Sequence, residues 1–90
     1  MKNLRLTIRG KVQGVFFRAE TKKMADLLGV KGFVKNETDG SVLVEAEGED
    51  NAIHNLIDYC HHGPQNATIE SVSVMLGKIS NYPNFEIRNS

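Results

Sequence analysis

One short segment near the N-terminus combines the residue types that bind a phosphate group. Residues 10–18 read GKVQGVFFR, with two glycines and a closing Arg18. Glycines permit tight turns that leave several backbone N–H groups pointing inward, and a helix that begins after the loop adds its own unpaired N–H groups and the positive end of its dipole. The Arg18 guanidinium adds a planar donor that suits phosphate oxygens. The segment indicates an anion site. An ordinary strand-to-helix loop with a surface arginine explains the same spacing, and the GK[ST] ending of a Walker loop is missing.

The histidines and the single cysteine fit structural roles better than chemical ones. His61 and His62 lie in the last turn of a predicted helix, where cationic side chains are favoured. His54 has no partner at metal-ligand spacing. Cys60 falls on an apolar stripe, which is typical of a packed thiol rather than a nucleophile. No cluster of carboxylates suggests a metal site, so we expect none.

The period of the apolar residues changes along the chain and predicts the elements that must position these groups. Alternation predicts strands, and a spacing of three and four predicts helices. The Asp39-Gly40 pair predicts a hairpin turn, Asp50 is a candidate N-cap, and one inserted residue near Glu70-Ser71 predicts a bulge. The expected elements are strands over 3–9, 30–35, 42–47, 68–76 and 85–88, and helices over 17–28 and from about 50 to the Gly63-Pro64 stop.

The order of these elements is strand, helix, strand, strand, helix, strand and a short last strand. This is the split βαβ arrangement, and it predicts an α+β, ferredoxin-like βαββαβ sandwich. Each predicted helix has a single apolar stripe. Both helices must therefore pack on one face of an antiparallel sheet.

Length and composition limit the chain to one small domain over residues 1–90. The sequence has 40% hydrophobic and 24% charged residues, and no apolar run approaches the roughly 18 residues that cross a membrane. We expect a cytoplasmic protein, because no signal peptide is visible and one cysteine cannot form an internal disulfide. Residues 1–35 hold nine Lys and Arg against two Asp and Glu, and residues 36–90 hold the reverse. Such asymmetry is typical of an anion or nucleic-acid surface, or of two halves that neutralise each other in one domain.

The segment at residues 10–18 resembles the signature Gly-x-Val-Gln-Gly-Val-x-Phe-Arg of the acylphosphatases, with every fixed position matched. Residues 28–42 resemble the family's second signature, with Phe33 where a tryptophan is often found. Gly63-Pro64-x-x-Ala67 and Phe85-x-Ile87 are also similar to family features, so the resemblance covers the whole chain.

The resemblance implies an enzyme that hydrolyses the carboxyl–phosphate bond of acyl phosphates without a metal or an organic cofactor. It implies that an asparagine, here Asn36, orients the attacking water. It also implies that the Arg18 guanidinium binds the phosphate together with backbone amides of the loop. Those amides belong to Gln13, Gly14, Val15, Phe16, Phe17 and Arg18.

The chemistry of the reaction agrees with this set of residues. The leaving group is a carboxylate whose conjugate acid has a pKa of about 4, so it needs no general acid. The enzyme must still position the substrate and stabilise the charge on the phosphoryl oxygens in the transition state. Backbone N–H groups together with one arginine can do both. Asn36 cannot ionise near neutral pH, but its side-chain amide can hold a water. Without the resemblance, Asn36 would be interpreted as a residue of the following turn.

Two other function classes fit the fold. A ferredoxin-like sheet can bind RNA, but that class needs aromatic residues on the central strands, which Val42-Leu43-Val44 does not provide. The alternative is a non-catalytic anion-binding domain. We therefore expect a monomer that binds a small acyl phosphate and competing inorganic phosphate, and neither nucleic acid nor a membrane.

Overall fold

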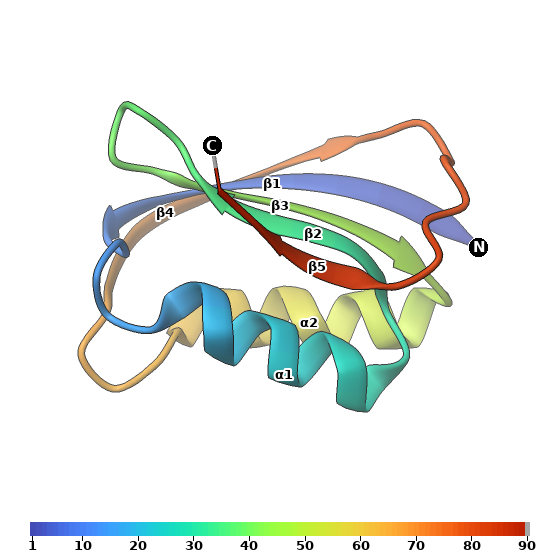
Figure 1. Cartoon of the computed structure of the whole chain (residues 1–90), viewed down its shortest axis with the longest axis horizontal. Coiled ribbons are helices and arrows are strands. Elements are labelled where there is room, and N and C mark those ends of the chain that lie inside the picture. The colour runs from blue at the N-terminus through green and yellow to red at the C-terminus, as the bar shows by residue number, and fades with distance from the viewer. Residues whose placement is uncertain (90) are drawn as a thin grey trace.

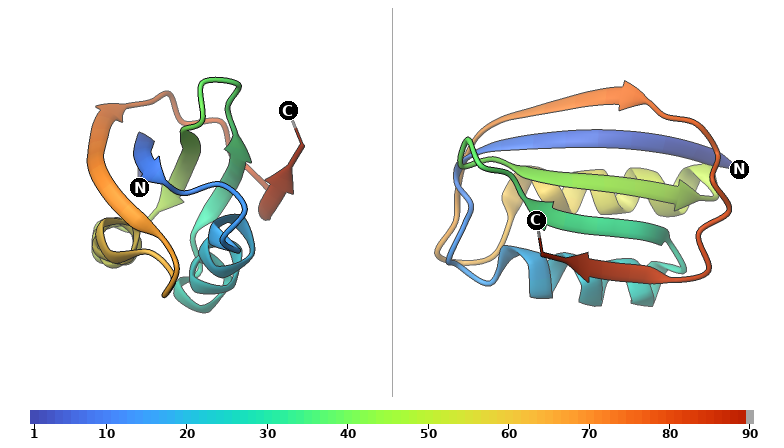
Figure 2. Two further views of the ribbon diagram at one scale, coloured as in Figure 1. Left: turned by 90° about the vertical axis from the view of Figure 1, so that its left-hand side faces the viewer. Right: turned by 45° about the horizontal axis from the view of Figure 1, so that its top comes forward.

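The computed structural model describes residues 1–89, in which two helices cover one face of a five-stranded sheet (Figure 1). This confirms the ferredoxin-like α+β sandwich. The helices run side by side beneath the sheet, and the second face carries none of the helices of the described residues (Figure 2). The elements are β1 (Lys2–Lys11), α1 (Phe17–Leu28), β2 (Lys31–Asn36), β3 (Val42–Gly48), α2 (Asp50–His62), β4 (Thr68–Leu76) and β5 (Phe85–Arg88).

The strand order across the sheet is β4-β1-β3-β2-β5. The first four strands pair antiparallel, as expected, whereas β5 pairs parallel with β2. Because β4 and β5 lie at opposite edges, residues 77–84 between them must cross the end of the sheet. The chain thereby carries β5 to the sheet edge that lies above α1 (Figure 1).

A bulge in β4 sets the end of β1. Arg9 pairs with Ser71 and Gly10 pairs with Ile69, so Glu70 is the extra residue, which confirms the predicted bulge. The strands approach so closely here that a Cβ on Gly10, whose φ is 132°, would lie 2.1 Å from the Thr68 carbonyl oxygen. Glycine is therefore required at the point where β1 leads into the loop over residues 10–18.

Both helices end as predicted and α1 also begins as predicted, whereas the N-cap of α2 differs from the expectation. Gly29 follows α1 in the left-handed conformation with φ 74°, and Gly63 follows α2. The expectation that Asp50 is the N-cap of α2 is wrong. Glu49 occupies that position without a side-chain hydrogen bond, and Asp50 is the first helical residue. Its carboxylate still lies in the first turn, where the helix dipole favours negative charge.

The core lies between the helices and the sheet and follows the predicted stripes. On α2 the buried side chains are Ile53, Leu56 and Cys60, which follow the helical spacing of three and four, and Ile57 is partly buried against the same cluster. The strand positions that face the helices are filled mainly by small or branched residues. The fully buried strand members are Leu6, Ile8, Val34, Val42, Val44 and Ala46.

Replacing Leu56 with alanine should destabilise the protein by about 2–5 kcal/mol. The side chain is fully buried in mid-helix, so its removal leaves a cavity that the closely packed core cannot fill. The effect should appear as a lower denaturant midpoint with an unchanged slope in urea unfolding. An unchanged midpoint would contradict the burial of this stripe.

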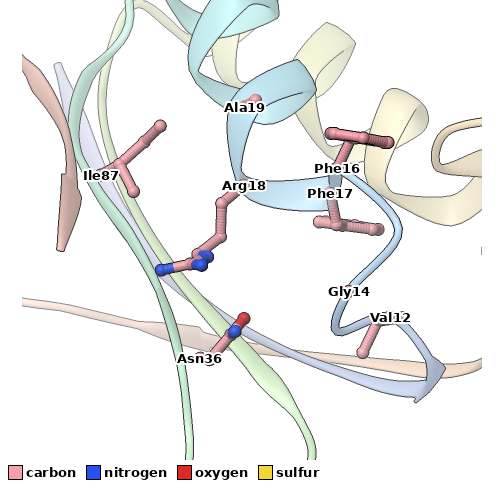
Figure 3. A pocket seen from close by; sticks show the side chains of 8 residues that line it. All are labelled: Val12, Gly14, Phe16, Phe17, Arg18, Ala19, Asn36 and Ile87. Atoms are coloured by element: carbon pink, nitrogen blue, oxygen red, sulfur yellow. The ribbon is translucent and has the colours of Figure 1, made fainter. Parts of the chain in front are cut away.

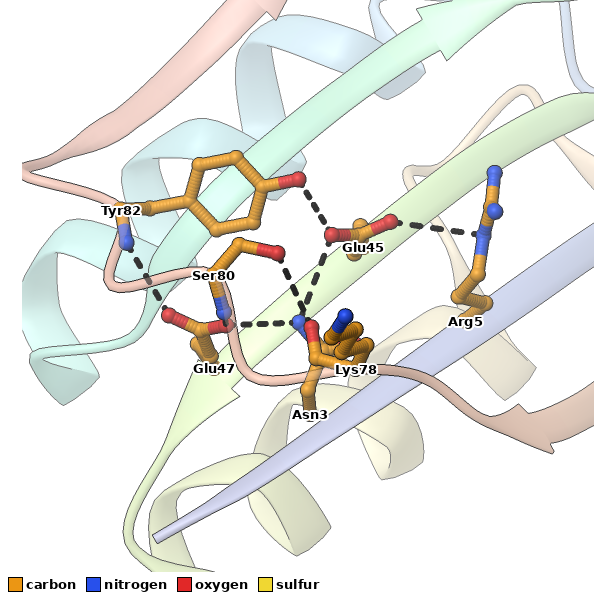
Figure 4. Close-up of polar contacts among 7 residues, drawn as sticks. All are labelled: Asn3, Arg5, Glu45, Glu47, Lys78, Ser80 and Tyr82. Atoms are coloured by element: carbon orange, nitrogen blue, oxygen red, sulfur yellow. Dashed lines mark hydrogen bonds and ion pairs between the residues drawn. The ribbon is translucent and has the colours of Figure 1, made fainter.

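Two buried carboxylates hold residues 77–84 against the open face of the sheet (Figure 4). Glu47 accepts hydrogen bonds from the backbone N–H groups of Ser80 and Tyr82, and from the Asn3 side-chain amide at 2.8 Å. Glu45 accepts one from the Tyr82 hydroxyl. Burial opposes ionisation of Glu47, but these donors outweigh it and lower the pKa of the carboxyl below its usual value. The connection that positions β5 is thus fixed by an ionised side chain.

Phe33 packs on the same open face, away from the loop that resembles a phosphate site. Its ring is 5% exposed. The Tyr82 ring meets it edge-on at 6.0 Å, and the Arg88 guanidinium lies 4.1 Å from its centre. The residue that departs from the family pattern therefore has a packing role and helps hold β5 to β2.

Candidate active site

The loop between β1 and α1 turns its backbone inward at two left-handed residues. Gly14 has φ 73° and Phe16 has φ 64° and ψ 19°. Left-handed residues between ordinary ones direct successive N–H groups to one side, which creates a concave anion site. Phe16 is also the N-cap of α1, and no side chain caps the helix there. The first N–H groups of the helix, including that of Arg18, therefore have no intrahelical acceptor and open toward the loop.

Side chains of the loop fix it in place. Val12 and Val15 are buried and anchor it in the core. The Gln13 side chain donates hydrogen bonds to the carbonyl oxygens of Glu37 and Ser41, at 2.8 and 2.9 Å. The loop is thereby tied to the β2–β3 hairpin. The Gln13 side chain thus serves this contact rather than a ligand.

Arg18 and Asn36 lie close together although they come from different elements. Arg18 extends from the first turn of α1, Asn36 ends β2, and their side chains point toward one another (Figure 3). The Arg18 guanidinium donates to the Asn89 side-chain oxygen at 3.1 Å. The Asn36 side-chain oxygen is buried and has no hydrogen-bond partner among the described residues. Buried acceptors of this kind are commonly satisfied by an ordered water.

These groups surround a cavity of about 310 Å³ at the N-terminal end of α1. Five of the predicted site residues line it, and Gln13 and Val15 do not contribute to its wall. Ile87 on β5 was missed as a site residue, and only its place in the Phe85-x-Ile87 pattern could have signalled it. Asn89 was missed as well, and no local pattern marks it. The lining residues are Val12, Gly14, Phe16, Phe17, Arg18, Ala19, Asn36 and Ile87.

The other nucleophilic and metal-ligating side chains lie outside this cavity. Burial raises the pKa of the Cys60 thiol to about 12, so the thiol is unreactive at neutral pH. His61 and His62 contact carbonyl oxygens of their own helix at 3.0 and 2.9 Å. Within residues 1–89, no group of three or more His, Cys, Asp or Glu side chains is arranged to hold a metal ion. No helix in that part of the chain is long and apolar enough to cross a membrane.

Comparison with known proteins identifies the family. The acylphosphatase family model matches residues 4–87. An acylphosphatase of Thermotoga maritima is 42% identical over 88 residues, which cover 98% of each chain. One of Rubrobacter xylanophilus is 47% identical over 73 residues, which cover 81% of this chain and 66% of that protein. The crystal structure of acylphosphatase from Bacillus subtilis superposes with a TM-score of 0.95 at 31% identity, over 98% of this chain and 99% of that one. The chain therefore belongs to the acylphosphatase family, whose members hydrolyse acyl phosphates.

Proposed function

We propose that Asn36 holds the attacking water, while Arg18 and the loop amides from Gln13 to Arg18 bind the phosphoryl group of a small acyl phosphate. The observation that carries the proposal is the placement of Arg18 and Asn36 on opposite walls of one cavity, with the Asn36 acceptor unpartnered among the described residues. Residues 1–90 act as one catalytic domain, which the single apolar core supports. A cytoplasmic location is part of the proposal and is supported by the single, buried, unpaired Cys60.

The phosphoryl group fits the end of the cavity that the loop encloses. Its oxygens carry most of the charge of the substrate, and the inward N–H groups and the helix dipole favour negative charge there. The guanidinium of Arg18 supplies two parallel donors in one plane. These donors bind the oxygens in the ground state and match the charge that spreads over them as the bond to the carboxylate breaks.

The attacking water approaches phosphorus from the side opposite the leaving carboxylate. Asn36, which lines the cavity, can hold this water through its side-chain amide and fix its direction. Neither a carboxylate nor an imidazole is present among the described residues that line the cavity. The proton of the water therefore leaves to an oxygen of the substrate's phosphoryl group or to bulk water. The carboxylate departs unprotonated, because the pKa of its conjugate acid, about 4, lies well below neutral pH.

Benzoyl phosphate is the substrate that tests this proposal. We expect hydrolysis with competitive inhibition by inorganic phosphate, because the product retains the contacts of the phosphoryl group. Activity should persist in EDTA, since the proposed steps use only protein donors. In water enriched in ¹⁸O, attack on phosphorus places the label in inorganic phosphate, whereas attack on the carbonyl carbon would place it in benzoate.

The same assay separates the alternatives. Binding of inorganic phosphate without turnover of benzoyl phosphate would indicate the non-catalytic anion-binding domain. Loss of activity in EDTA, restored by a divalent metal, would contradict a mechanism carried by Arg18, Asn36 and the loop amides alone. Label in benzoate would contradict the placement of the water beside phosphorus.

A further inference from the structure

Two apolar side chains at the mouth of the cavity have no part in binding phosphate or water. Phe16 is 77% exposed and Ile87 is 42% exposed, and both line the cavity. They lie on opposite sides of the Arg18 side chain (Figure 3). A single exposed apolar residue needs no explanation, but two that flank the entrance of one cavity form a surface that an incoming molecule must pass.

Phe16 is unfavourable at its position for three separate reasons. A bulky residue in the left-handed conformation, here with φ 64°, is a conformational outlier. Its side chain cannot cap the helix that starts after it, although asparagine, serine or aspartate would. Its ring is mostly in water. Asparagine or glycine would relieve the strain and remove the exposed ring, so the ring at this position points to a function rather than to folding.

Ile87 reaches the cavity through the alternation of β5. Phe85 is two residues earlier on the same face of the strand and is buried in the core. Ile87 is one step further along that face, beside the start of α1, where the core ends and the cavity begins. The hydrogen bond between Arg18 and Asn89 keeps this end of the chain at the cavity.

We propose that Phe16 and Ile87 form an acyl platform, which binds the organic part of the substrate and makes the enzyme prefer aromatic or branched apolar acyl phosphates over acetyl phosphate. This inference rests on the proposed function, because it needs the phosphoryl group at the loop amides. With that end enclosed, the acyl group must extend outward between the two side chains. Aromatic and apolar groups bury apolar surface there, whereas an acetyl group is too small to reach both.

The charges around the cavity favour the same substrates. Among the described residues that line it, Arg18 is the one with a charge, and the phosphoryl group uses it. A second anionic group on the acyl part would meet Phe16 or Ile87 instead of a cation. Such a group gains no ion pair from the residues that line the cavity. An apolar acyl group, by contrast, gains contact with both side chains of the acyl platform.

The test compares two substrates, so that differences in loop geometry cancel. We would measure kcat/KM for benzoyl phosphate and for acetyl phosphate in the wild type, in Phe16→Asn and in Ile87→Ala, and express each variant by the ratio of the two values. Asparagine tolerates the left-handed backbone, so Phe16→Asn removes the ring without adding strain. The ratio should fall about tenfold for Phe16→Asn and about threefold for Ile87→Ala, because the phenyl ring offers the acyl group more apolar surface than the isoleucine side chain does.

Leu27→Asn is the matched control, because Leu27 is 74% exposed on the same helix and lies outside the cavity. Its ratio should equal that of the wild type. A ratio that is unchanged in Phe16→Asn overturns the acyl platform, even if both rates fall together, and leaves the proposed function standing. A wild-type protein that hydrolyses neither substrate overturns the proposed function itself.

Discussion

Replacing Asn36 with alanine should lower kcat by about 10²-fold or more and leave KM nearly unchanged. In the proposed mechanism the side chain holds the water and has little part in holding the substrate, so its loss removes an interaction that matters only on the way to the transition state. Inhibition by inorganic phosphate should also stay near the wild-type value, because the loop amides and Arg18 are intact. Steady-state kinetics with benzoyl phosphate and a phosphate inhibition series measure both quantities.

The backbone contacts of Asn36 survive this substitution. Its backbone pairs with Val42 across the β2–β3 hairpin, and its side-chain oxygen bonds to no described residue. The variant should therefore give the circular dichroism spectrum and the denaturant midpoint of the wild type. Asn55→Ala, which replaces an exposed asparagine on α2, is the control and should keep full activity. Near-normal turnover of the Asn36 variant would contradict the water-positioning role.

The sequence predicts those features of the fold that depend on the spacing of neighbouring residues. The extra residue Glu70 was visible because Ile69 is out of phase with Val72, and the bulge appears there. The end of α1 was visible in Gly29. The start of α2 was not, because an acidic residue favours both the cap and the first helical turn, and the choice between Glu49 and Asp50 depends on backbone angles. Sequence spacing predicts the elements more reliably than their ends.

Long-range contacts were beyond such reasoning. Arg18 meets Asn89 across 71 positions of sequence, and Glu47 meets Ser80 across 33. Both contacts depend on the path of residues 77–84 across the end of the sheet. The spacing of apolar residues in the sequence does not specify that path. Asn36 illustrates the same limit within the site. Its spacing before a hairpin turn indicates only a turn residue, and its place opposite Arg18 follows from the packing of α1 on the sheet.

The site therefore depends on residues outside the loop that resembles a phosphate site. Glu47 and Asn3 hold the crossing segment, the crossing segment positions β5, and β5 brings Asn89 to Arg18. Gln13 ties the loop to the hairpin whose first strand ends at Asn36. The positions of Arg18 and Asn36 thus depend on contacts with residues outside the loop. Such contacts hold together two side chains that are far apart in the sequence.

Arg18→Lys should weaken phosphate binding and slow turnover together, with kcat/KM for benzoyl phosphate reduced by about 10²–10³-fold. Lysine retains the positive charge but has a compact ammonium on a flexible stem in place of two parallel donors in one plane. The ground state loses one directed hydrogen bond, and the transition state loses more, because its charge is spread over several phosphoryl oxygens. The bond from Arg18 to Asn89 also loses its fixed geometry.

The inhibition constant of inorganic phosphate distinguishes this variant from the asparagine variant. It should rise several-fold in Arg18→Lys and stay constant in Asn36→Ala, because, of these two side chains, the proposal places only that of the arginine on the phosphoryl group. If Arg18→Lys lowered kcat but left phosphate inhibition unchanged, the arginine would act in the transition state alone and the loop amides would carry binding by themselves. The double variant measures the coupling between the two side chains. Because Arg18 and Asn36 lie side by side in one cavity and act in the same step, its loss in kcat/KM should be smaller than the product of the two single losses.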